Sequence, residues 1–233
     1  LWQARRAEAS AAIAAANAQR AERVKEFLIG LFEVADPEKA GGDVPAREII
    51  EQAGKRLESE LTSEPLIRAD LLEAVARIDR GLGLLDPASA SAQRALAIRA
   101  RELPAEDSAI AAARATLGSV HLDQGKIDAA LAELAQAASQ LVASEPTSSF
   151  LLARVRSDYG NALFSKGRVE EAESLERMVW KTYAAVLGAD NIQTAFHRRN
   201  LGVLLDELDR LEEAEEAFRI SQAVIERVLG ADH

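Results

Sequence analysis

The sequence predicts an all-α fold, a right-handed solenoid of antiparallel helix hairpins. One pattern of small and large apolar residues returns every 42 residues. A fixed period of that size indicates a stacked array of one helical unit. Hydrophobic residues make up 48% of the 233 positions and aromatic residues only 4%, so the apolar surface is mostly alanine, leucine, isoleucine and valine. That composition also favours helices.

The repeated pattern is clearest between Leu117 and Ala130. Its large apolar position is held by Val75, Leu117, Tyr159 and Leu201. The small position that follows is held by Ala76, Gly118, Gly160 and Gly202, and a recurrent alanine further on by Ala46, Ala88, Ala130, Ala172 and Ala214. Because small residues let two helices cross closely, we expect the small position to face the recurrent alanine.

The N-terminal part, residues 1–62, is predicted to form a long helix and a degenerate capping hairpin. The helix covers residues 3–35 and ends at Asp36-Pro37, and a loop with two glycines follows at residues 39–43. A second helix covers about residues 45–61, with Pro45 in its first turn. The alanine-rich start of the long helix is read as an exposed extension, or else as a helix that leaves a membrane span or pairs with a second copy.

Residues 63–233 are predicted to hold four repeats, at about 66–107, 108–148, 149–191 and 192–233. In the first repeat, one helix covers residues 70–80 and its partner starts at Asp86-Pro87. Gly83, Gly125 and Gly167 fall between paired helices, where a residue with positive φ ends the first helix. Asp209 takes this place in the last repeat, as the exception.

Charge and composition exclude several classes of protein. The chain has 38 acidic and 28 basic residues, a net charge of -10, which argues against nucleic acid as a partner. It has no cysteine, which excludes disulfides and thiolate metal sites, and no apolar run long enough to span a bilayer.

Because it begins with Leu1, we expect a segment upstream, which could include a membrane span. The last helix has no following helix to cover Phe218 and Ile225, so we expect another chain or a continuation past His233.

The repeat resembles the tetratricopeptide repeat. Leu117-Gly118, His121, Gly125, Ala130 and Ala137 stand at the offsets of that family's consensus. The 42-residue period and the ending Leu229-Gly230-Ala231-Asp232-His233 look like the longer, kinesin-light-chain-like variety. The resemblance covers residues 66–233, and its departures are Ala76, Asp79 and Asp209. It implies a protein-interaction domain.

A second resemblance concerns the N-terminal region. Residues 1–6, 23–33 and 46–50 look like the segment after the membrane span in bacterial transmembrane serine/threonine kinases with a C-terminal repeat domain. This implies a sensor or regulatory domain of a membrane-anchored kinase, on the extracytoplasmic side of the inner membrane. The alternative is a dimerisation or scaffolding module in the cytoplasm. A homodimer would form through residues 1–30 or through the C-terminal helix.

The sequence contains no pattern typical of an active site, so we expect no catalytic residue, no cofactor and no metal. His121, His197 and His233 are the only histidines, and no carboxylate stands near them at ligand spacing. Residues 80–83 hold two glycines but follow a helix, unlike a dinucleotide-binding loop. Trp180 is expected in the core.

The tetratricopeptide resemblance implies that first helices line a concave groove that binds a peptide or protein. The residues predicted to face this groove are Glu73, Arg77, Arg80, Ser119, Asp123, Asp158, Asn161, Phe164, Arg199 and Asn200. Asn161 and Asn200 match positions where family members hold peptide backbone, since an amide both donates and accepts hydrogen bonds. The three arginines could meet acidic groups on the ligand.

Overall fold

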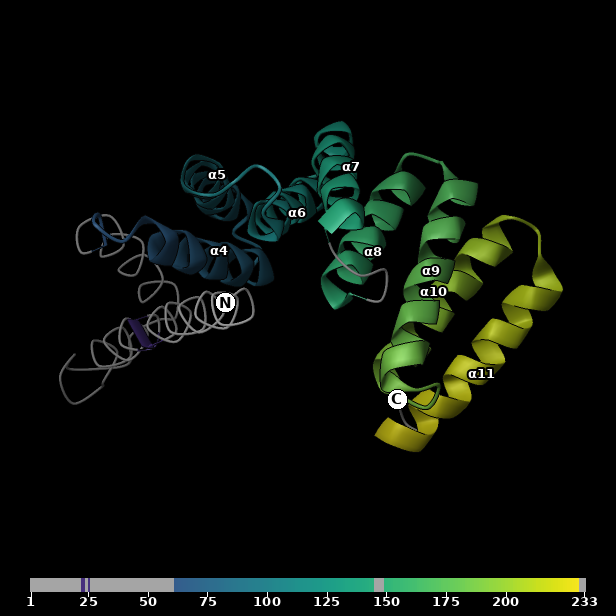
Figure 1. Cartoon of the computed structure of the whole chain (residues 1–233). Coiled ribbons are helices and arrows are strands. Elements are labelled where there is room, and N and C mark those ends of the chain that lie inside the picture. Colours follow the sequence, from purple (N-terminus) through teal and green to yellow (C-terminus); the bar gives the residue numbers. More distant parts are fainter. Residues whose placement is uncertain (1–21, 24, 26–60, 145–148, 231–233) are drawn as a thin grey trace, which may run out of the picture. The chain divides into compact units, whose positions relative to one another are not determined.

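Every regular element that the structure describes is a helix (Figure 1). The structure is a computed structural model, and it describes residues 22–23, 25, 61–144 and 149–230. The predicted long helix, loop and capping hairpin of residues 3–61 fall almost entirely outside these ranges. The chain divides into two compact units, residues 1–102 and 103–233.

The described helices form four hairpins. Unit 1 holds α4 (Pro65–Gly81) with α5 (Leu85–Glu102). Unit 2 holds α6 (Ser108–Asp123) with α7 (Ile127–Ser144), α8 (Phe150–Ser165) with α9 (Val169–Leu187), and α10 (Ile192–Glu207) with α11 (Leu211–Leu229). The prediction of an all-α helical repeat fold is therefore confirmed. None of the helices in the described ranges carries an apolar stretch long enough to cross a bilayer.

Local sequence explains where these helices begin and end. Pro65 lies in the first turn of α4, where its missing N–H costs nothing, so this helix starts earlier than predicted. Asp107 and Asn191 accept hydrogen bonds from the backbone N–H groups two residues on, each at 2.9 Å, and so cap α6 and α10. The turn residues Gly83, Gly125 and Gly167 have φ values of 74°, 72° and 80°, and Asp209 has 56°. The prediction of a positive φ is confirmed at the three glycines, and Asp209, the exception in residue type, adopts a positive φ as well.

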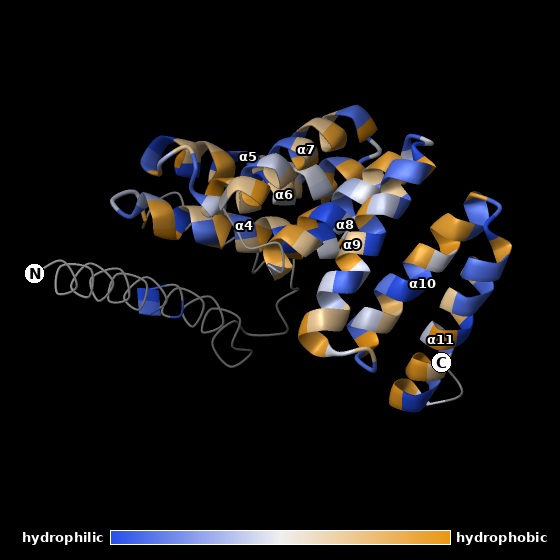
Figure 2. Ribbon diagram, turned by 45° about the vertical axis from the view of Figure 1, so that its right-hand side comes forward, coloured by the Kyte–Doolittle hydropathy of each residue, from blue (hydrophilic) through white to orange (hydrophobic). Residues whose placement is uncertain are grey.

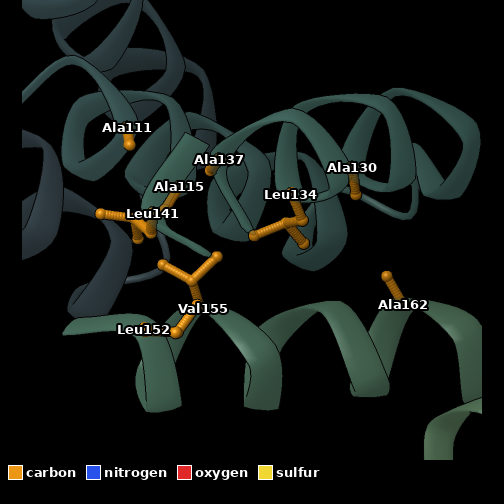
Figure 3. Close-up of a cluster of buried hydrophobic side chains, with 9 residues drawn as sticks. All are labelled: Ala111, Ala115, Ala130, Leu134, Ala137, Leu141, Leu152, Val155 and Ala162. Atoms are coloured by element: carbon orange, nitrogen blue, oxygen red, sulfur yellow. The ribbon is translucent and has the colours of Figure 1, made fainter. Parts of the chain in front are cut away.

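The core of unit 2 lies between consecutive hairpins. Leu134 and Leu141 on α7 are fully buried, as are Leu152 and Val155 on α8. Figure 3 shows Val155 pointing from α8 into the space between Leu141 and Leu134. Along each described helix, hydrophilic and hydrophobic residues are interspersed (Figure 2). A single hairpin could not bury this face, which is why the repeats stack.

The prediction that small residues face the recurrent alanine is wrong in two of the three hairpins of unit 2. A Cβ on Gly118 would lie 2.7 Å from Leu134 Cγ, and one on Gly202 would lie 2.8 Å from Phe218 Cε1. The glycine therefore makes room for a large side chain one helical turn after the alanine. Phe218 accordingly packs inside its own hairpin, which corrects the expectation that it lies on the uncovered face.

Gly160 is the exception among these crossings. Its Cβ would meet the carbonyl oxygen of Ala172 at 3.6 Å and Leu175 Cβ at 3.8 Å, which are ordinary contact distances. The residue equivalent to Leu134 and Phe218 in this hairpin is Glu176, and its side chain reaches to the next hairpin instead.

Candidate interaction surface

The ten predicted groove residues fall into two groups, one in each compact unit. Glu73, Arg77 and Arg80 belong to α4 in unit 1, and the other seven belong to unit 2.

Glu73 is buried inside its hairpin, which corrects its predicted place on an open groove. Its side chain is 7% exposed and is paired with the guanidinium of Arg99 on α5. Asp70 binds the same guanidinium at 2.8 Å. Arg77 remains half-exposed, with Nη1 3.9 Å from Glu73. In unit 1, the ion pair between α4 and α5 therefore holds the hairpin together, and Arg77 is an exposed cation beside it.

Ser119 is also buried, contrary to the prediction of an open position. Its hydroxyl contacts the carbonyl oxygen of Ala115 at 2.9 Å and the carboxylate of Asp158 at 2.6 Å. Since Asp158 lies on α8, this contact joins two neighbouring first helices. Asp123 is exposed near the end of α6. Ser119 and Asp158 thus help to set the spacing of α6 and α8.

Both α8 and α10 carry exposed side chains at predicted positions. Asn161 and Phe164 are exposed on α8, and Arg199 is exposed on α10, while Asn200 is half-buried. The sequence analysis missed two further exposed residues on α10: Phe196, which is 36% exposed, and Val203, which is 44% exposed. The spacings 161/164 and 196/199/203 put each set on one side of its helix. We name this set, Asn161, Phe164, Phe196, Arg199 and Val203, the α8/α10 face.

The α8/α10 face combines apolar surface with a cation and an amide. The guanidinium of Arg199 lies 5.4 Å from the centre of the Phe196 ring, within range of a cation–π contact. Leu163 on α8 and Leu204 on α10 lie in one buried cluster beneath this face. The repeat register could have identified Phe196 and Val203, because they stand 42 residues after Arg154 and Asn161.

A polar pair joins the last two hairpins behind this face. Glu176 and His197 have side chains that are 4% and 16% exposed, and Oε1 lies 2.8 Å from Nδ1. Tyr183 packs on the His197 ring with 4.3 Å between ring centres. His197 therefore has a structural role, in a contact between α9 and α10. Glu176 is 21 residues away along the chain, so the partner is not visible from local spacing.

Trp180 is half-buried and packs against a cluster that includes Leu201 and Leu205. The Arg198 guanidinium lies 4.6 Å from the centre of the Trp180 ring. Burial lowers the pKa of Arg198, and the nearby carboxylate of Glu216 opposes this effect. Trp180 is therefore a packing residue between α9 and α10. Within the described ranges, no group of three His, Asp or Glu side chains is arranged to hold a metal ion.

Comparisons with known proteins agree with this architecture. The tetratricopeptide repeat family matches residues 151–227. No curated protein sequence matches the chain. In structure the chain is similar to BtubC (BKLC) from P. vanneervenii, with a TM-score of 0.69 and 18% identity over 82% of this chain and 78% of that one.

Two further solved structures have the same architecture. A putative kinesin light chain from Podosopora anserina, with nearly identical TPR-like repeats, has a TM-score of 0.65 and 17% identity over 89% of this chain and 97% of that one. A Rap protein complexed with Competence and Sporulation Factor has a TM-score of 0.64 and 15% identity over 87% of this chain and 50% of that one. At these identities the likeness shows the fold: the chain is an all-α array of helix hairpins like those of tetratricopeptide repeat proteins, and residues 151–227 match that family itself.

Proposed function

We propose that the chain is a protein-interaction module and that its α8/α10 face binds an extended peptide or a partner helix. The observation that carries this proposal is the exposure of Phe164 and Phe196 on equivalent helices of adjacent hairpins. Exposed aromatic rings supply large contact area, and an arginine beside them is a frequent partner in protein interfaces.

The chemistry of the face defines the expected ligand. Phe164, Phe196 and Val203 offer apolar surface to apolar side chains. The Arg199 guanidinium can form charge-assisted hydrogen bonds with a carboxylate, and the Asn161 amide can donate to and accept from peptide backbone. We therefore expect a segment that carries an apolar side chain next to an acidic one. The solved Rap complex supports the idea that a fold of this kind can hold a partner.

A displayed library of 12-residue peptides, selected against the full chain, tests the proposal. Bound peptides should be enriched in apolar residues next to Asp or Glu. The double substitution Phe164→Ala with Phe196→Ala should weaken their binding by roughly 30-fold, since central aromatic contacts are often worth about 2 kcal/mol or more. Leu211→Ala is the matched control, because Leu211 is 60% exposed but lies on α11 away from this face.

Two outcomes would count against the proposal. Selected peptides that bind the double variant as tightly as the original chain would place the binding surface elsewhere. A library that yields no peptide with micromolar or better affinity would remove peptide binding as the function of this face.

The wider prediction of a regulatory domain of a membrane-anchored bacterial serine/threonine kinase stays a prediction. It depends on residues 1–6, 23–33 and 46–50, most of which lie outside the described residues. The extracytoplasmic location and the cytoplasmic alternative depend on the same residues. A homodimer through residues 1–30 or the C-terminal helix is likewise untested. Measuring molecular mass against concentration, with and without residues 1–19, addresses the dimer.

A further inference from the structure

A second candidate site lies where α8, α9 and α10 meet, and its Arg154 stands two helical turns before Asn161 on the same side of α8. Phe150, Leu151 and Arg154 come from the first turn and a half of α8, Tyr183 and Leu187 from the end of α9, and Gln193 from the start of α10. These six residues line a pocket of about 400 Å³, which we name the Tyr183 pocket. That volume falls in the range of small-molecule sites.

The walls of the Tyr183 pocket are mostly apolar and partly open to solvent. The Phe150 ring meets the Tyr183 ring edge to face, with 5.2 Å between ring centres. Phe150 remains 40% exposed and Leu187 37% exposed. A ligand that covered these side chains would remove apolar surface from water, which is favourable at roughly 25 cal/mol per Å².

Polar groups stand at one side of this apolar pocket. Arg154 is exposed, and no carboxylate in the described part of the chain lies within ion-pair distance of it. Burial raises the pKa of Tyr183, the charge of Arg154 opposes that effect, and the nearby carboxylates of Glu176 and Asp158 raise the pKa as well, so the Tyr183 hydroxyl stays protonated at neutral pH. The guanidinium, the Tyr183 hydroxyl and the Gln193 amide are all hydrogen-bond donors. A set of donors that includes an arginine suits a carboxylate.

The repeat itself shows that the fold does not need these side chains. One repeat earlier, the positions of Phe150, Arg154 and Tyr183 hold Ser108, Ala112 and Leu141. One repeat later they hold Ile192, Phe196 and Ile225. In the first described hairpin they hold Leu66, Asp70 and Arg99. The combination of two aromatic rings with an arginine therefore occurs in one of the four described hairpins, and the other three fold with different residues at these positions.

We propose that the Tyr183 pocket binds a small amphiphilic carboxylate, whose aromatic or branched aliphatic body lies against Phe150, Tyr183 and Leu187 and whose carboxylate pairs with Arg154. This is a small-molecule site, distinct in ligand class from the peptide surface proposed above. It requires no catalytic step, because the ligand is bound through its charge and its apolar body.

The probes for this site are 4-phenylbutyrate and its neutral amide, titrated into the full chain and followed by NMR. At roughly 0.3 kcal/mol per heavy atom, the acid should bind with a dissociation constant in about the millimolar range, and the amide about 10-fold more weakly. Arg154→Met should remove the preference for the acid, and Tyr183→Leu should weaken both probes. Leucine already fills the Tyr183 position one repeat earlier, so this variant is expected to fold, which circular dichroism checks.

Arg219→Met serves as the control, because it removes another exposed arginine, on α11, that does not line the pocket. Unchanged affinity in this variant, with loss of the acid preference in Arg154→Met, supports the proposal. Equal binding of acid and amide, or an acid preference that survives Arg154→Met, overturns it. A third probe, N-acetyl-Gly-Gly-Phe, carries the same groups at the end of a peptide. Binding of this probe more than 10-fold tighter than 4-phenylbutyrate would also overturn it, by making the pocket a site for a peptide terminus.

Discussion

Oε1 of Glu176 on α9 lies 2.8 Å from Nδ1 of His197 on α10. One repeat earlier, the same two positions hold Leu134 and Val155. Leu134 and Val155 belong to one buried apolar cluster, so the polar pair takes the place of an apolar contact between hairpins. A buried polar pair is often no more stabilising than the apolar pair it replaces, although breaking it is costly. The preceding repeat supplies the apolar version for a direct comparison.

The first prediction concerns this pair. Glu176→Leu alone should lower the free energy of unfolding by about 1 to 3 kcal/mol, because it leaves His197 Nδ1 without its partner in a mostly buried place. The double variant Glu176→Leu with His197→Val should recover that loss, since it restores the apolar pair of the preceding repeat. Urea unfolding of both single variants and the double variant gives the coupling energy. Additive losses in the double variant would contradict the assigned pairing.

The second prediction concerns the crossing glycines. Gly118→Ala should destabilise the chain by about 1 to 3 kcal/mol, because the new Cβ would lie 2.7 Å from Leu134 Cγ. Gly160→Ala is the matched control: its nearest contact is 3.6 Å, and alanine favours a helix over glycine by up to about 1 kcal/mol. Thermal unfolding should therefore shift down for the first variant and stay level or rise for the second. Equal shifts would mean that the two crossings are packed alike.

The third prediction concerns the buried ion pair of unit 1. Arg99→Met leaves the carboxylate of Glu73 buried without its cation, and losses of about 3 to 5 kcal/mol are usual for such a change. Arg77 lies 3.9 Å from the same carboxylate, but its side chain is 53% exposed. Arg77→Met should therefore cost less than about 1 kcal/mol. Chemical unfolding of the two variants tests the difference. If Arg77→Met lowers the free energy of unfolding as much as Arg99→Met does, the exposed arginine is an equally important partner of Glu73.

The fourth prediction concerns the pH dependence of stability. Burial lowers the pKa of His121 below its ordinary value of 6.5, Lys126 lowers it further, and Glu133 opposes the shift. The Nδ1 atom is buried and has no hydrogen-bond partner in the described part of the chain. The unfolded chain therefore binds a proton at a higher pH than the folded chain. Stability is retained above about pH 6.5 and decreases as the pH falls through that value.

His121→Leu should reduce this loss at acidic pH, and the repeat already places Leu163 and Leu205 at the equivalent position. Unfolding free energies measured between pH 5 and pH 8 check the change in slope. Asp79, at the same position in unit 1, provides a contrast. Burial raises the pKa of Asp79 above its ordinary value of 3.8. The folded chain therefore holds this proton more tightly than the unfolded chain, and the stability that Asp79 contributes is lost as the pH rises above about 3.8. An unchanged slope after His121→Leu would assign the acid sensitivity to other groups.

The sequence determined the helical architecture of the repeats because their constraints are local and periodic. The apolar pattern returns every 42 residues, so each hairpin repeats the same helical unit. The ends of the helices depend on single residues: a proline in the first turn of α4, and residues with positive φ between paired helices. Turn chemistry and the spacing of apolar residues therefore sufficed to predict the all-α repeat fold and its turns.

Only the tertiary structure decided which side chains are available for binding. Glu73 and Ser119 occupy predicted groove positions, yet Arg99 and Asp158 engage them from other helices, 26 and 39 residues along the chain. Glu176 and His197 likewise replace an apolar contact with a polar one. The Tyr183 pocket brings together residues of three helices. Burial and pairing depend on neighbours distant in the sequence, so a repeat register places a residue on a helix face but does not say what covers it.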